Sequence, residues 1–193
     1  MSMKSIQLIG MYTIMRKEVS RIFRIWPQTL LPSVTSTTLY FLIFGAFIGS
    51  RIGDVNNVSY IEFLIPGLIM MSVIMNGYMN VSSTFFGAKF QRNIDEMLVS
   101  PLSHLSILLG FISGGILRSC IVGFLVTVVS MVFTPLSIHN IFLVIFTVVI
   151  TATFFALGGF LNALYAKRFD DISIVPTFVL TPLTYLGGVF YSI

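Results

Sequence analysis

The stretch IFLVIFTVVITATFFALGGFLNALY runs from Ile141 to Tyr165 without a charged side chain. A helix needs about 20 apolar residues to cross a hydrocarbon core of about 30 Å, and this stretch is longer than that. The whole chain is 56% hydrophobic and only 9% charged, with a mean hydropathy of +0.97. These values lie far outside the range of soluble proteins. The sequence therefore predicts a membrane protein.

Four further stretches are long enough to span a membrane, namely residues 27–49, 63–88, 105–133 and 172–193. Arg118 is the one charged residue within them. The pattern predicts an all-α polytopic membrane protein with five transmembrane helices. Because the connections are too short for a soluble domain, residues 1–193 are expected to form a single transmembrane domain. It comprises an N-terminal segment, 1–26, and a five-span bundle, 27–193.

The N-terminal segment shows helical spacing with two distinct sides. Its apolar side contains Met11, Met15, Val19, Ile22, Phe23 and Trp26, and its polar side contains Arg16, Lys17, Ser20, Arg21 and Arg24. This pattern predicts an amphipathic helix that lies on the membrane surface and contacts lipids. A helix packed on a partner protein is the alternative.

Lysine and arginine are unevenly distributed between the loops. One side of the predicted bundle has Lys4, Arg16, Lys17, Arg21, Arg24, Lys89, Arg92, Lys167 and Arg168, whereas the loops on the other side have only Arg51. Because cytoplasmic loops retain basic residues, the N-terminus is expected in the cytoplasm. With five spans, Ile193 is then expected outside.

The sequence offers no enzyme site, cofactor site or metal site. Its single cysteine, Cys120, lies in an apolar span, and His104 and His139 lie at opposite membrane faces without a second ligand nearby. The chain has no Gly-Lys dipeptide and therefore no phosphate-binding loop. Asp170 and Asp171 adjoin basic residues and are interpreted as a solvated charge cluster. The basic residues form no continuous stripe, which argues against nucleic acid as a partner.

The connection at residues 92–101, RNIDEMLVSP, predicts a short amphipathic helix. Its apolar side contains Phe90, Ile94, Met97 and Leu98, while Arg92, Asp95 and Glu96 point elsewhere. Pro101 makes Ser100 extended and so ends the helix. A short helix held between two spans could transmit motion. The alternative is a solvated connector with a weak Arg92–Glu96 pair.

This run resembles the signature of ABC-2-type transporter permeases. The segments FLIPGL at 63–68 and PLTYLGGVFY at 182–191 are similar to that family as well. The resemblance implies a bacterial inner-membrane exporter subunit that pairs with a second permease subunit and with separate ABC ATPase subunits. It also implies that the signature contacts the ATPase, through Arg92, Ile94, Asp95, Glu96, Met97, Leu98 and Pro101.

The resemblance also implies a sixth span, and this sequence departs from the family there. We therefore expect the 193 residues to be a truncated reading frame or one part of a split permease. Two other function classes stay open. One is a secondary transporter or channel acting alone, which needs carboxylates in the membrane. Glu62, at the outer edge, is the near-membrane carboxylate that the sequence indicates. The other is a fragment that does not transport.

Polar residues inside the spans are candidates for a transport path, because they are costly in hydrocarbon unless they have partners. They are Ser72, Asn76, Asn80 and Ser83 in the second span, Thr35, Ser36, Thr37 and Thr38 in the first, and Arg118 in the third. Asn76, Asn80 and Arg118 are the strongest candidates, with helix–helix hydrogen bonding as the alternative. Arg118 either lies deep in the membrane or, if its helix projects into the cytoplasm, nearer the surface. The residues do not identify a substrate.

Overall fold

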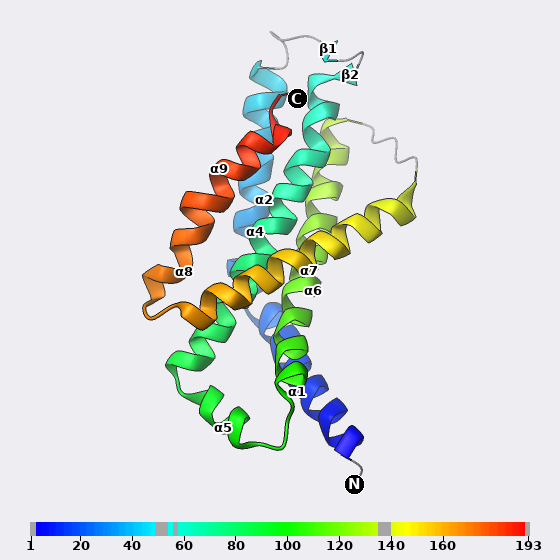
Figure 1. The fold of residues 1–193 in the computed structure, drawn as a ribbon. Helices are drawn as coiled ribbons and strands as arrows, with labels where there is room; N and C mark the ends of the chain where they lie inside the picture. The colour runs from blue at the N-terminus through cyan, green and yellow to red at the C-terminus, as the bar shows by residue number, and fades with distance from the viewer. Residues whose placement is uncertain (1–2, 49–53, 56–57, 135–139, 192–193) are drawn as a thin grey trace.

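The computed structural model describes residues 3–48, 54–55, 58–134 and 140–191. Arg51, His139 and Ile193, on which part of the sequence reasoning depends, lie outside these ranges. The described part is almost entirely helical, as expected for an all-α polytopic membrane protein (Figure 1).

The elements follow one another from a long N-terminal helix to a broken C-terminal one, where η denotes a π-helical segment. They are α1 (Met3–Arg24), α2 (Trp26–Tyr40), η1 (Phe41–Ile48), β1 (Asp54–Val55), β2 (Val58–Ser59), α4 (Tyr60–Phe90), α5 (Asn93–Val99), α6 (His104–Phe133), α7 (Ile141–Tyr165), α8 (Phe169–Val175), η2 (Pro176–Leu180), α9 (Thr181–Thr184) and η3 (Tyr185–Val189). The strands β1 and β2 form a small antiparallel hairpin.

Among the described residues, four helical stretches are long and apolar enough to cross a membrane: Tyr60–Phe90, His104–Phe133, Ile141–Tyr165 and Phe169–Val189. They correspond to the second to fifth predicted spans. The first predicted span appears as α2 continued by η1, without a break in helical backbone at Phe41. Its many serine and threonine residues make α2 less apolar than the other four.

Helix α4 lies at the centre of the bundle and has its most extensive contacts with α7 and α6. Small residues allow these helices to approach closely. A side chain added at Gly77 would come within 2.7 Å of Ser119 Oγ, and one added at Gly115 would come within 2.5 Å of Val81. Because lipid tails are as apolar as the core, close packing and hydrogen bonds drive association of such helices. The hydroxyl of Ser119 donates to the carbonyl oxygen of Val73 at 2.9 Å across the α4–α6 contact.

Helix α1 packs along α6. The predicted division of the α1 surface into one apolar and one polar side is therefore incomplete. Ile14, Glu18 and Ile22 are buried and form a third side that contacts the protein. Gly110 and Gly114 of α6 make room, because a side chain at either would approach Ile14 or Glu18 to 2.7 Å. Ile22, expected against lipid, is therefore part of the core. Tyr12, Met15, Phe23 and Trp26 are exposed and form an aromatic, apolar outer surface.

Figure 1 shows α1 and α5 at one end of the bundle and the β1–β2 hairpin at the other. We call these the α5 end and the hairpin end. The outer surface of α7 is exposed and apolar over most of its length, from Phe142 to Leu161. Such a surface is suited to lipid.

Candidate functional site

Helix α5 is the predicted coupling segment, and one side of it packs against its own bundle. Ile94 and Met97 contact a buried cluster that includes Phe86 and Ile107. Both side chains are half-buried in this contact, and their predicted contact with an ATPase stays a prediction. A charged substitution at Met97 would disturb the packing against the bundle as well as any contact with a partner.

The rest of the α5 surface is exposed and has a mixed chemical character. Asp95 and Glu96 are exposed, as are Leu98 at 54% and Val99 at 89%. We call these four residues the α5 outer face. An apolar pair with an acidic border has the composition of an interface core and its rim. Val99 was absent from the residues predicted to contact an ATPase. A helical projection groups Leu98 with Ile94 and Met97 on one apolar side and leaves Val99 outside that side.

Two contacts fix the position of α5 relative to the spans. At its C-terminal end, the Gln7 side chain of α1 donates to the carbonyl oxygen of Pro101 at 2.7 Å. The Gln7 carbonyl oxygen accepts from the Ser103 amide at 2.7 Å and from the Ser106 hydroxyl at 2.9 Å. Ser103 also caps α6 by accepting from the Ser106 amide at 3.2 Å. Movement at this end of α5 is therefore linked to α1.

The second contact lies at the N-terminal end of α5 and involves Lys89, in the last turn of α4. Its ammonium group donates to the carbonyl oxygens of Leu164 at 2.7 Å and Ala166 at 2.9 Å. These carbonyls end α7, where the negative end of the helix dipole favours a cation. Phe90 packs against Phe169 of α8, with ring centroids 4.9 Å apart. The chain that enters α5 is thereby joined to the α7–α8 turn.

The intramembrane polar residues of the first and second spans meet each other. The hydroxyls of Thr37 and Ser72 lie 3.2 Å apart. One turn closer to the α5 end, the Asn76 amide donates to Ser33 Oγ at 2.9 Å. We call this antiparallel series the α2–α4 ladder. It gives the Asn76 side chain a partner from α2, so the alternative of helix–helix bonding is realised for this residue.

Asn80, one turn further along α4, lies in a buried cluster with three charged residues, the Arg21–Arg118 cluster. The side-chain oxygen Oδ1 of Asn80 accepts from Arg21 Nη2 at 2.9 Å and from Arg118 Nη1 at 3.4 Å. Arg21 also forms an ion pair with Glu18, with 3.3 Å between Nη2 and Oε2. Arg118 donates from Nη2 to the carbonyl oxygen of Thr29 at 2.9 Å. The cluster thus joins α1, α2, α4 and α6.

Glu18 is a carboxylate that the sequence analysis did not single out, and it is only 3% exposed. Burial raises its pKa, while the neighbouring Arg21 acts in the opposite direction. Its ion-pair partner Arg21 lies in the same helix and in turn donates to Asn80 of α4, so Glu18 supports the contact that holds α1 on the bundle.

The position of Arg118 relative to the other helices is defined by two neighbours. Its guanidinium contacts Thr29, in the first turn of α2, and lies beside Arg21, in the last turn of α1. Arg118 is therefore level with the α1–α2 junction, and the preceding turns of α6 lie alongside α1. A start of α6 that projects beyond the hydrocarbon core, the second of the two predicted depths, would follow from the predicted position of α1 on the membrane surface.

Comparison with known proteins identifies the family. The chain matches the family described as "ABC-2 type transporter" over residues 10–193. It belongs to the ABC-2 type transporter family. The prediction from the signature at residues 92–101 is thus confirmed, and the chain is a multi-pass membrane permease of an ABC transporter.

Several relatives of this ABC-2 permease are known by name. It is 57% identical over 185 residues to the inner membrane transport permease YadH of Escherichia coli strain K12, an alignment that covers 96% of this chain and 72% of YadH. It is 22% identical over 171 residues to nodulation protein J of Neorhizobium galegae, covering 88% of this chain and 65% of that protein. No solved structure matches the chain.

Three residues with clear structural roles are not indicated by the sequence: Gln7, Glu18 and Lys89. Gln7 and Lys89 act across sequence separations of 94 and 75 residues. No local pattern indicates such partners. Glu18 interrupts an apolar, helically spaced series, and this was the available signal that it faces the protein.

Proposed function

We propose that this chain is the permease subunit of an ABC exporter that contains a second permease subunit and separate ATPase subunits. The α5 outer face is the observation that carries the proposal. Leu98 and Val99 are exposed on a short helix that is fixed to α1 at one end and to the α7–α8 turn at the other. A force applied to this face would move several spans together, as conformational coupling requires.

The proposed orientation places the α5 end in the cytoplasm, where ATP is available. The basic residues that are predicted to be cytoplasmic gather at this end of the bundle. They lie in α1, at the ends of α4 and α7 and beside α5 (Figure 1). Single cysteines at Ser59 and Arg92 in a Cys120→Ser background should react with an impermeant thiol reagent from opposite sides of the membrane. Reaction of both from the same side would contradict the orientation.

The docking test substitutes Leu98→Asp together with Val99→Asp and measures co-purification with the ATPase encoded for this transporter. Two charges in the centre of the contact should reduce complex recovery by more than tenfold, because an apolar interface core carries most of the binding energy. Tyr165→Asp is the matched control, since Tyr165 is 83% exposed near the same end. Unchanged recovery with the double variant would return α5 to the role of a solvated connector.

Asn80 and Arg118 are proposed to act at the α1 junction rather than as substrate contacts, because Asn80 accepts from Arg21 and Arg118 donates to Thr29. Asn76 stays the candidate for the transport path, because it lines a groove between α2, α4 and α9. Arg118→Met should lower the thermal stability and loosen α1. If the variant kept its stability but lost transport, a direct substrate role for Arg118 would be the better interpretation.

A further inference from the structure

The Arg21–Arg118 cluster contains more positive than negative charge. Arg21 and Arg118 both donate to the one side-chain oxygen of Asn80, at 2.9 and 3.4 Å. Their guanidinium groups therefore lie within two hydrogen-bond lengths of each other. Glu18 supplies a carboxylate, whose ion pair is with Arg21. Within the part of the chain that the structure describes, Arg118 has no ion-pair partner, so the repulsion between the two arginines is only partly offset.

The same cluster has more hydrogen-bond donors than acceptors. Among the described residues, the buried nitrogens Arg21 Nε, Asn80 Nδ2 and Arg118 Nε lack a hydrogen-bond partner, and Asn80 is 0% exposed. A buried donor without an acceptor is costly, and more so when it is charged. Guanidinium and amide nitrogens can only donate. The group that would complete the cluster is therefore an acceptor that carries negative charge.

A row of cations connects the cluster with the surface of α1. Lys17, Arg21 and Arg24 follow one another at i, i+4 and i+7, so they lie on one side of the helix. Lys17 and Arg24 are exposed, and the Arg21 side chain is 26% exposed. An anion that approaches this side of α1 thus meets positive charge from the surface inward to Arg21.

The α1–α2 junction also exposes large apolar side chains. Phe23, Trp26 and Leu31 are 60%, 51% and 49% exposed. Arginine and lysine together with tryptophan are typical of the headgroup level of a bilayer, and the predicted position of α1 on the membrane surface puts the junction at that level. A phosphate group attached to acyl chains matches both the cations and the apolar surface, whereas a free phosphate matches only the cations.

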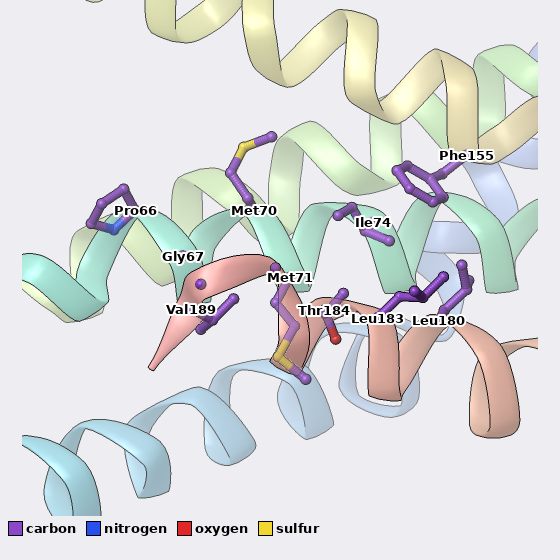
Figure 2. Close-up of a pocket in the computed structure, with 12 residues that line it drawn as sticks. Pro66, Gly67, Met70, Met71, Ile74, Phe155, Leu180, Leu183, Thr184 and Val189 are labelled. Atoms are coloured by element: carbon purple, nitrogen blue, oxygen red, sulfur yellow. The ribbon is translucent and has the colours of Figure 1, made fainter. Parts of the chain in front are cut away.

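Two cavities in the described part of the bundle offer no comparable site for an anion. The pocket in Figure 2, of about 450 Å³, is lined mainly by apolar side chains such as Met70, Ile74 and Phe155. The groove between α2, α4 and α9, of about 340 Å³, is more polar but has no charged lining residue. An anion in either cavity would lose its hydration without meeting a counter-charge. The Arg21–Arg118 cluster lines neither of them.

We propose that the Arg21–Arg118 cluster binds the phosphate group of an anionic phospholipid from the leaflet at the α5 end. The planar guanidinium groups of Arg21 and Arg118 bind the phosphate oxygens, and Arg24 adds positive charge at the surface. A phosphate oxygen then takes the place of the long 3.4 Å contact between Arg118 and Asn80. The lipid is a resident part of the permease that holds α1 on the bundle, and it is not cargo. The proposal goes beyond the proposed function, since this binding needs neither ATP nor the ATPase.

The test is native mass spectrometry of the purified permease, titrated with phosphatidylglycerol or with phosphatidylcholine of identical acyl chains. The first phosphatidylglycerol should bind at least about fivefold more tightly, because the choline group brings a further positive charge to a site that already has an excess. Inorganic phosphate in large excess should not displace it, because free phosphate has no acyl chains. Equal affinity for the two lipids, or displacement by inorganic phosphate, would overturn the proposal.

Variants connect the binding to named residues. Arg21→Met and Arg118→Met should each weaken phosphatidylglycerol binding about tenfold or more, the factor for a hydrogen bond from a charged group. Arg118→Lys, which keeps the charge without the planar fork, should retain the preference for phosphatidylglycerol at severalfold lower affinity.

Arg24→Gln keeps the test independent of the fold. Arg24 is exposed and, among the described residues, has no hydrogen bond or ion pair, so this variant should unfold at the temperature of the wild type. It should nevertheless bind phosphatidylglycerol about fivefold more weakly. Arg16→Met is the matched control, because Arg16 is exposed on another side of α1. If Arg24→Gln and the two methionine variants of the cluster lose no more affinity than Arg16→Met, the lipid does not bind at this cluster.

Discussion

Lys89 is expected to contribute more to stability than a lysine without such contacts, because its ammonium group donates to the carbonyl oxygens at the end of α7. It donates to Leu164 and Ala166 at 2.7 and 2.9 Å, and it lies 3.5 Å from the carbonyl oxygen of Ala163. Lys89 is itself exposed, and an exposed cation at a helix C-terminus contributes about 0.3–1 kcal/mol. Lys89→Met should therefore cost about 1 kcal/mol.

The measurement is thermal unfolding of the permease in nanodiscs, followed by the loss of monodisperse protein. For a chain of this size, about 2–4 °C per kcal/mol predicts a decrease in Tm of roughly 2–4 °C. Lys89→Arg should recover most of the loss, since it keeps the cation. Lys167→Met is the control, because within the described residues Lys167 is bonded through its backbone amide and not through its ammonium group. A Tm for Lys89→Met equal to that of the control would refute this interpretation of the contact.

Three further predictions concern the same end of the bundle. Gln7→Ala should cost about 1–2 kcal/mol and speed amide hydrogen exchange at Ser103, as measured by mass spectrometry; exchange unchanged from wild type would mean that α1 does not restrain α5. Gly114→Val should cost about 1–3 kcal/mol by overpacking and expose α1 to protease, whereas Gly87→Ala should be neutral, because nothing lies within 4 Å of a side chain there. The backbone amides of Lys167 and Arg168 donate to the Asp171 carboxylate and lower its pKa. The protection of these two amides from hydrogen exchange, measured by mass spectrometry, should therefore be complete above the ordinary aspartate pKa of about 3.9. It should be lost as the pH falls through the lower pKa that Asp171 has in the folded protein. In Asp171→Asn this pH dependence should disappear, and its persistence would point to another group.

The sequence determined the membrane class of the protein and most of its spans, because a run of apolar residues long enough to cross a bilayer is a local property. The stretch Ile141–Tyr165 was predicted with the bounds of α7, and α6 begins one residue before the predicted start. The signature at 92–101 gave the family for a similar reason, since it is continuous in the chain. Its helical character was also local, and α5 forms within it.

Only the tertiary structure decided which side of each amphipathic helix faces the protein. Helical spacing places Ile94, Met97 and Leu98 near one another, yet the bundle covers the first two and leaves Leu98 exposed with Val99. Helical spacing likewise gave α1 two sides and missed the third, protein-facing side. The glycines that make room for α1 lie on α6, 96 residues away from Ile14 and Glu18 in the sequence. The partners of Asn80 and Arg118 come from four different helices. Such contacts depend on how helices pack, and packing is set by complementary surfaces that are distant in the chain.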